Sequence, residues 1–255
     1  MNEPPPRPSD AELHEVHRLR LVEVAPPPLS PEEQRVEDRA WAEAVRANPN
    51  LFDGPAAACT GLAWEGPHSA VISWARTTYR RYARHRAPDT APAGLPALFV
   101  AIVQPTEDGR VLVGRMAPWT STPGRWQLPG GSIEPPAPHE PLDTAALRSH
   151  AARELSEETG IDRPPDDLTP WLVLRSGARR SVGVVFRAPD RPAHWLGERH
   201  AALRSAEAAQ GRVPELDRIH LVGSADELTG LDGPCAAYLE PILRHYQETV
   251  RRRGA

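Results

Sequence analysis

The stretch Arg153-Glu154-Leu155-Ser156-Glu157-Glu158-Thr159-Gly160-Ile161 decides most of what the sequence predicts about this chain. It ends a helix that we predict to begin near residue 142, because Gly160 is the residue type that commonly closes helices in a left-handed conformation. On a helix that turns about 100° per residue, Glu154, Glu157 and Glu158 share one face. Neighbouring carboxylates repel one another and weaken a helix, and a divalent cation relieves that repulsion. The stretch therefore predicts a metal site with hard oxygen ligands, suited to Mg²⁺ or Mn²⁺.

Two nearby features extend this pattern. Arg153 stands four residues before Glu157, so its guanidinium can pair with that carboxylate and orient it. Upstream, the predicted strand Trp126-Gln127-Leu128 leads into Pro129-Gly130-Gly131, where backbone amides are open to an anion because no Cβ shields them. Acids that bind metal, next to a turn that accepts anions, indicate phosphoryl chemistry.

The rest of the chain divides near residue 90, in a Pro-rich stretch at 87–94 that disfavours continuous helix or strand. We predict an N-terminal unit over 1–94 and a second unit over 95–255. The first unit is predicted to contain strands at 18–24, 57–64 and 70–74 and helices at 31–47 and 77–85. The second is predicted to contain a hairpin of strands 98–103 and 111–114, further strands at 171–174, 182–187 and 219–222, and a helix at 234–250. This order favours an α/β fold with a mixed sheet covered on two faces.

Composition limits the classes of partner. The 255 residues include 40% hydrophobic residues, enough for a buried core, and carry a formal net charge of −4. Without a basic excess we expect no nucleic-acid partner, and without a run of about 18 apolar residues we expect no membrane partner. Cys59 and Cys235 have no spacing typical of a zinc site or a disulfide scaffold. The start of the chain has no apolar signal segment, so we expect a cytoplasmic protein with a small-molecule partner.

The nine residues from Arg153 to Ile161 resemble the second half of the signature of the Nudix hydrolases at every specified position. The first half departs from the family pattern. Gly131 stands 22 positions before Arg153 where the pattern has 14, and Ala145 occupies the place of the first Glu of the signature. The acids that could replace this Glu are Glu134, Glu140 and Asp143, and of these we choose Glu140.

The resemblance implies an α/β/α sandwich over about residues 96–248 with a smaller N-terminal α+β extension. It implies a divalent metal, Mg²⁺ or Mn²⁺, and hydrolysis of a diphosphate bond in a nucleoside diphosphate linked to another moiety. It assigns Arg153, Glu154 and Glu157 to catalysis and Glu154, Glu157 and Glu158 to the metal, with Glu154 acting as a ligand or as the base. Gly130 and Gly131 would contact substrate. Glu215 is our candidate for an additional acid from a later loop.

For the substrate, Asn48-Pro49-Asn50-Leu51-Phe52-Asp53-Gly54-Pro55 and the segment 77–82 are similar to the N-terminal extension of Nudix enzymes that cleave UDP-glucose and UDP-galactose. This likeness implies that residues 1–94 form a wall, lid or interface, with Arg80 and Arg81 binding phosphate, and that the substrate is a nucleotide sugar. Two alternatives stay open: a nucleoside triphosphate pyrophosphohydrolase, and a Nudix-fold sensor that binds a nucleotide sugar without cleaving it. The family also implies a homodimer.

Overall fold

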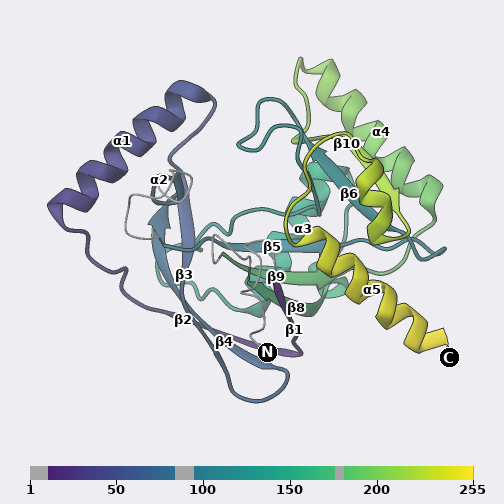
Figure 1. The fold of residues 1–255 in the computed structure, drawn as a ribbon, viewed down its shortest axis with the longest axis horizontal. Helices are drawn as coiled ribbons and strands as arrows, with labels where there is room; N and C mark the ends of the chain where they lie inside the picture. Colours follow the sequence, from purple (N-terminus) through teal and green to yellow (C-terminus); the bar gives the residue numbers. More distant parts are fainter. Residues whose placement is uncertain (1–10, 84–94, 176–180, 255) are drawn as a thin grey trace, which may run out of the picture.

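The computed structural model describes residues 11–83, 95–175 and 181–254 (Figure 1). The domain boundary predicted near residue 90 lies outside the described residues. Three sheets are present in the described part of the chain. One has four strands in the order β1-β8-β9-β5, and two have three strands each, in the orders β10-β6-β7 and β2-β4-β3.

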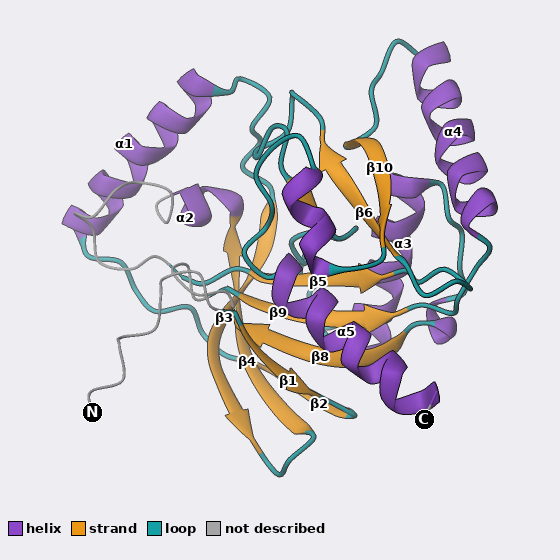
Figure 2. Ribbon diagram, turned by 45° about the vertical axis from the view of Figure 1, so that its right-hand side comes forward, coloured by secondary structure: helices purple, strands orange, loops and turns teal. Residues whose placement is uncertain are grey.

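The four-stranded sheet is mixed, as predicted. It contains β1 (Glu12–Glu15), β8 (Thr169–Arg175), β9 (Val182–Arg187) and β5 (Leu98–Val103). β5 runs parallel to β9, whereas β8 is antiparallel to both β9 and β1. Helix α3 (Thr144–Thr159) and helix α5 (Leu239–Gly254) lie on opposite sides of this sheet (Figure 2). The arrangement is the α/β/α sandwich that the resemblance implies.

The two faces of this sheet follow from the alternation of side chains along a strand. On β5, Val100 and Ile102 pack into the core beneath α3, together with Leu147 and Leu155 of that helix. Ala101 and Val103, in contrast, pack into the core that includes α5. The side chains of all four β5 residues are buried, and a strand covered on both faces reads as a continuous apolar run. Residues 98–103 have this pattern, which is why the sequence predicted the strand correctly.

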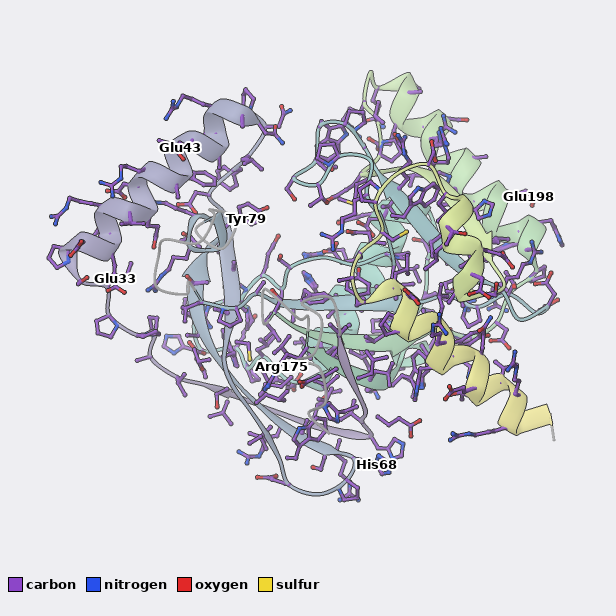
Figure 3. All side chains as sticks on the ribbon, viewed as in Figure 1. Glu33, Glu43, His68, Tyr79, Arg175 and Glu198 are labelled. Carbon is purple, nitrogen blue, oxygen red and sulfur yellow. The ribbon has the colours of Figure 1, made fainter. Side chains whose placement is uncertain are left out.

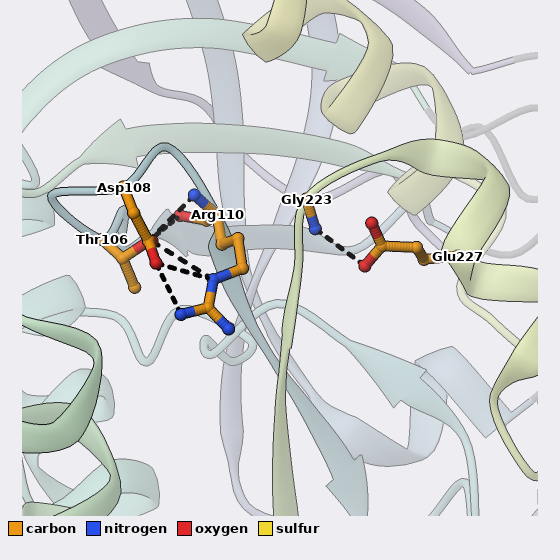
Figure 4. A network of polar contacts seen from close by, with 5 residues as sticks. All are labelled: Thr106, Asp108, Arg110, Gly223 and Glu227. Carbon is orange, nitrogen blue, oxygen red and sulfur yellow. Dashed lines mark hydrogen bonds and ion pairs between the residues drawn. The ribbon is translucent and has the colours of Figure 1, made fainter.

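The predicted hairpin of residues 98–103 and 111–114 is wrong. Strand β6 (Val111–Met116) does not pair with β5 but with β10 (Leu216–Val222) and β7 (Trp126–Gln127), in another sheet. The turn itself is well formed. The amide of Arg110 donates to Oγ1 of Thr106 over 2.8 Å, and its guanidinium pairs with Asp108, whose pKa falls to about 2 because of these bonds (Figure 4). The two strands diverge beyond this turn because each is buried against its own partners.

The N-terminal unit forms a sheet of its own. It contains β2 (Arg18–Glu23), β4 (Ser69–Thr78) and β3 (Pro55–Trp64), with helices α1 (Pro31–Ala47) and α2 (Tyr79–Ala83) on the left of Figure 1. Helix α1 begins as predicted, because Ser30 and Glu33 form a capping box. The predicted helix at 77–85 is shorter in the described residues, because β4 continues to residue 78.

The two units are joined by several contacts. Strand β1, which the sequence did not reveal, pairs with β8, and Ala58 bridges to Ala97. The insertion that displaces the first half of the signature lies against the N-terminal sheet, where Nη1 of Arg76 donates to the carbonyl of Pro136 over 2.6 Å. These contacts attach the N-terminal sheet to the loop that precedes α3.

Helix α4 (Ala193–Ala209) was also missed. Only Leu196 and His200 of this helix are buried, so its sequence offers little apolar periodicity. Helix α5 begins at Leu239, five residues after its predicted start, because residues 235–238 first form a bridge and a turn. Two short 3-10 helices, η2 (Pro165–Asp167) and η3 (Ala225–Gly230), complete the described elements. No described helix has the combination of length and apolar character needed to cross a bilayer.

Candidate active site

The acidic stretch lies on the last turns of α3. Asp143 caps the start of the helix, because its side chain accepts a hydrogen bond from the amide of Ala146 over 2.9 Å. Gly160 ends it with a φ of 74°, as the sequence predicted. The apolar side chains of Leu147 and Leu155 are fully buried against the sheet. Packing of this face fixes the rotation of the helix and therefore the direction in which its acidic side chains point.

The Pro-Gly-Gly turn approaches this helix closely. The amide of Gly130 donates a hydrogen bond to Oε2 of Glu158 over 2.7 Å. A Cβ on Gly130 would stand 2.2 Å from the carbonyl oxygen of Val100, and Gly130 has a φ of 141°. A Cβ on Gly131 would stand 2.5 Å from Oε2 of Glu154. The first position therefore requires glycine, because the backbone atoms of β5 cannot move away, whereas a Cβ at the second position would displace the Glu154 carboxylate.

The acids of α3 differ in burial. The Glu158 side chain is buried, and burial is the main cause that raises its pKa well above its ordinary value, followed by the charges of Glu215 and Glu154. The pKa of Glu154 rises to about 7, again mainly through burial, while Arg153 lowers it and the other acids raise it. Glu157 stays largely exposed. The charges of neighbouring acids, Glu157 and Glu215 among them, thus contribute to the raised pKa values of Glu154 and Glu158.

Arg153 contacts several groups of the site at once. Its guanidinium lies 4.0 Å from Oε1 of Glu157 and 3.7 Å from Oε1 of Glu154. It also donates to Nδ1 of His150 over 2.8 Å. Because Nδ1 accepts this bond, the proton of the neutral ring is on Nε2, which faces Oε1 of Glu154 at 3.2 Å and the carbonyl of Ser132 at 3.1 Å. Burial and Arg153 lower the His150 pKa to about 4, so the ring is neutral at pH 7.

His150 was missed by the sequence analysis, although it stands four residues before Glu154 on the same face of the helix. That spacing is the only signal that could have found it.

The structure places the three candidates for the missing first Glu differently. Glu140 is exposed, and it forms no side-chain contact with the site among the described residues. Asp143 serves as the cap of α3. Glu134 instead places Oε2 3.9 Å from the Arg153 guanidinium, and its charge contributes to the raised pKa of Glu154. The insertion therefore follows Glu134, and this acid keeps its place near Arg153 because Ser132 and Ile133 are still held against β5.

Glu215 faces the same site from the start of β10. Its carbonyl accepts the amide of Ala117 over 2.8 Å, and the next residue, Leu216, is fully buried. Burial and then the charge of Glu157 raise the pKa of Glu215, although its side chain keeps contact with solvent along the cavity. Glu215 and Glu154 of α3 thus line the same cavity.

A cavity of about 360 Å³ opens beside these acids. Its polar end is formed by Gly130, Gly131, Glu154 and Glu215. The other described lining residues are uncharged, apart from one arginine. They come from several elements. They include Phe99, Met116, Gln127, Tyr238 and Arg125, and also Tyr79 of the N-terminal unit, which is labelled in Figure 3. The N-terminal unit therefore contributes a wall residue to this cavity.

Arg80 and Arg81, which we expected to bind phosphate, lie elsewhere. Arg80 forms ion pairs with Glu37 and Asp38, and Arg81 lies 3.8 Å from Glu37 and donates to the carbonyl of Pro27 over 3.2 Å. Neither residue lines the cavity. Because Glu37 is buried, it needs these cations, and the two arginines fix α1 to α2.

The donor chemistry of the site fits a hard divalent cation. Glu154, Glu157, Glu158 and Glu215 offer carboxylate oxygens, which Mg²⁺ and Mn²⁺ prefer. Their side chains repel one another where they stand. The ligand set is not preformed, however, because no three His, Cys, Asp or Glu side chains of the described chain are grouped closely enough to hold an ion.

Comparison with known proteins is consistent with this geometry. The family described as NUDIX domain matches residues 95–219. No curated protein matches the chain. Among solved structures, the MutT protein of Methanosarcina mazei Go1 is 20% identical at a TM-score of 0.38, with 63% of this chain and 98% of that chain covered. RenU, a Nudix hydrolase of M. smegmatis, is 22% identical at a TM-score of 0.35, with 61% and 86% covered.

The identification rests on the sequence match and not on these low TM-scores. The matched residues include the Pro-Gly-Gly turn, all of α3 and Glu215, which are the parts that form the acidic end of the cavity. Residues 95–219 therefore form a NUDIX domain with a complete second half of the signature on α3, and this domain supports a Nudix hydrolase enzyme.

Proposed function

We propose that the enzyme hydrolyses a diphosphate bond of a nucleotide sugar in a reaction that depends on Mg²⁺. The observation that carries this proposal is that Glu154 and Glu215 line one cavity together with Gly130, whose amide donates to the buried Glu158. A cluster of acids that repel one another is costly unless a cation joins it. Glu154, Glu157 and Glu158 would hold the metal, with Glu215 as an additional ligand.

When bound, Mg²⁺ offsets the charge of a diphosphate and makes water more acidic. The protein's own groups supply the rest. Glu154, which lines the cavity and whose pKa burial raises to about 7, would take a proton from water as the base where it does not serve as a metal ligand. Nε2 of His150 is hydrogen-bonded to the carbonyl of Ser132 and lies 3.2 Å from Oε1 of Glu154, and the Gly130 amide donates to Glu158.

The nucleotide-sugar part of the proposal rests on the N-terminal unit. The segments that resemble the extension of UDP-sugar enzymes contain Tyr79, and Tyr79 lines the cavity. A wall made by this unit can read the part of the substrate beyond the diphosphate.

The test is incubation with a panel of nucleoside diphosphate sugars and nucleoside triphosphates, with Mg²⁺ present, followed by measurement of released nucleoside monophosphate. We expect turnover of a nucleotide sugar and its loss when EDTA replaces Mg²⁺. Preferential turnover of triphosphates would favour the alternative pyrophosphohydrolase. Binding of a nucleotide sugar without turnover of any compound would favour the sensor.

Substitution then tests the residues. Glu157→Gln should reduce turnover by at least about 10³-fold while the melting temperature changes little, because Glu157 is exposed and contributes charge rather than packing. The matched control is Glu198→Gln, which removes an exposed carboxylate of α4 that does not line the cavity (Figure 3). Full activity of Glu157→Gln would exclude the proposed ligand set. The homodimer stays a prediction, which a mass measurement in solution decides.

A further inference from the structure

One basic side chain lines the cavity from outside the acidic stretch. Of the described residues that line it, Arg125 is the only one with a basic side chain. It stands directly before Trp126 of β7, on the loop that follows β6. Among the described lining residues, the cavity therefore combines the acids Glu154 and Glu215 with the guanidinium of Arg125.

This guanidinium is free to bind an anion. No acidic side chain of the described chain lies within ion-pair distance of Arg125. Other arginines differ in this respect: Arg115 pairs with Asp217 at 3.4 Å, and Arg153 pairs with Glu154 and Glu134. A guanidinium without an acidic partner in a cavity is available to an anionic ligand, and it can bind a phosphoryl group through two parallel hydrogen bonds.

The backbone holds Arg125 in place. Its carbonyl accepts the amide of Met116 over 2.9 Å, and its amide donates to Thr122 over 3.2 Å. The loop before it is attached to the N-terminal unit, because Nδ2 of Asn48 donates to the carbonyls of Trp119 and Thr120 over 3.2 and 3.0 Å. Little conformational freedom of the loop remains to be lost when a ligand binds.

Tyr238 connects Arg125 with the acidic end. Its ring is buried and lies 5.9 Å from the ring of Phe99, between centroids. The hydroxyl is close enough to both Arg125 and Glu158 that each changes its pKa, which burial raises to about 12. The hydroxyl is therefore protonated at neutral pH. Arg125, Tyr238 and the acids Glu154 and Glu215 line the same cavity of about 360 Å³.

We propose that Arg125 binds the phosphoryl group of the substrate that does not face the acids of α3, and that it is a specificity-determining residue for diphosphates. This inference rests on the proposed function for the identity of the substrate. Arginine suits the role because its planar fork matches phosphate geometry, whereas lysine offers a point charge.

The first experiment measures binding and not activity. Inorganic pyrophosphate, a probe that has no base and no sugar, is titrated into the protein in the presence of Mg²⁺ by calorimetry. We expect Arg125→Gln to weaken binding by at least about tenfold, the loss typical of one charge-assisted hydrogen-bond pair. Arg125→Lys should retain part of the affinity. The matched control is Arg218→Gln, which removes an exposed, Asp232-paired guanidinium of β10 and should leave affinity within about twofold.

Kinetics supply the second measurement. With the substrate that the panel identifies, Arg125→Gln should raise KM by at least about tenfold and change kcat much less, because the contact is present in the bound ground state as well. Equal pyrophosphate affinity in the wild type and Arg125→Gln, or no binding to the wild type, would overturn the inference. If pyrophosphate binds through Arg125 but no panel compound is hydrolysed, the proposed function fails and the inference holds. Unchanged melting temperatures show that both variants are folded.

Discussion

The amide of Gly130 donates a hydrogen bond to Oε2 of Glu158 over 2.7 Å, so the Pro-Gly-Gly turn and the acidic helix form one unit. The turn is itself held by β5, because the carbonyl of Pro129 accepts the amide of Ile102 over 2.8 Å. A strand of the central sheet, a turn and a helix thus meet at one carboxylate. The bond also reduces the cost of burying that carboxylate, since an amide donor favours its charged form.

The two glycines of this turn should respond differently to substitution. Gly130→Ala should destabilise the protein by about 2–5 kcal/mol in urea unfolding, because its Cβ meets backbone atoms that cannot move and its φ of 141° is strained for alanine. Gly131→Ala should cost much less stability, since its Cβ meets the end of the Glu154 side chain, but it should strongly reduce turnover by displacing that carboxylate.

Gly109→Ala is the matched control for Gly130. It also has a positive φ, 83°, but a Cβ there meets nothing within 4 Å. We expect a loss of about 1–2 kcal/mol from backbone strain alone. Equal losses at Gly109 and Gly130 would show that steric contact with β5 contributes nothing.

Two carboxylates of the loop before α3, Glu134 and Glu140, can be compared as replacements for the first Glu of the signature. Glu134→Gln should lower kcat about threefold to tenfold, because the Arg153 guanidinium loses a partner at 3.9 Å and orients Glu157 less well. Glu140→Gln should keep activity within about twofold, since Glu140 is exposed and does not contact the site. Steady-state kinetics at saturating Mg²⁺ decide between them. The reverse order of effects would restore Glu140 as the replacement acid.

The contact between the two units can be tested through Asn48. Asn48→Ala removes both hydrogen bonds to the loop before Arg125, so the amides of residues 119–125 should exchange hydrogen faster and KM should rise. Global stability should fall by about 1–2 kcal/mol. Asn50→Ala is the control, because among the described residues Asn50 is bonded only through its backbone amide. If exchange in this loop stays the same in Asn48→Ala, the N-terminal unit does not hold it.

Stability should decrease below pH 6.5, and His200 should contribute to this dependence. Its ring is buried and donates from Nε2 to the carbonyl of Leu216 over 3.0 Å. Burial, followed by the charge of Arg204, lowers the His200 pKa, although the bond to Leu216 and the charge of Asp217 oppose this shift. Since the unfolded chain binds a proton at a higher pH than the folded chain, unfolding is favoured as the pH falls below the unfolded value.

Urea unfolding between pH 8 and pH 5 measures this effect. His200→Gln, which keeps a donor at the position of Nε2 but does not titrate, should show a shallower loss of stability toward low pH than the wild type. Identical slopes would mean that the ring is protonated in the folded protein as readily as in the unfolded chain.

The sequence by itself determined the acidic helix and the neighbouring turn. Gly160, the capping residues Ser30 and Glu33, and the apolar run at 98–103 act through local geometry or burial on two faces, so each leaves a pattern that can be read along the chain. The resemblance to the Nudix hydrolases could likewise be read from nine consecutive residues, Arg153 to Ile161.

The tertiary structure decided what depends on contacts between distant residues. Residues 98–103 and 111–114 form strands as predicted, but only the competition for burial sends them to different sheets. Arg80 and Arg81 looked like phosphate ligands until packing placed buried Glu37 beside them, whereas Arg125 stands in the cavity without an acidic partner in the described chain. The residue type sets the sign of a charge, and the spacing along the chain sets its place on a helix. Which partner neutralises that charge is a matter of three-dimensional proximity, because electrostatic energy depends on distance through space and on exclusion of water.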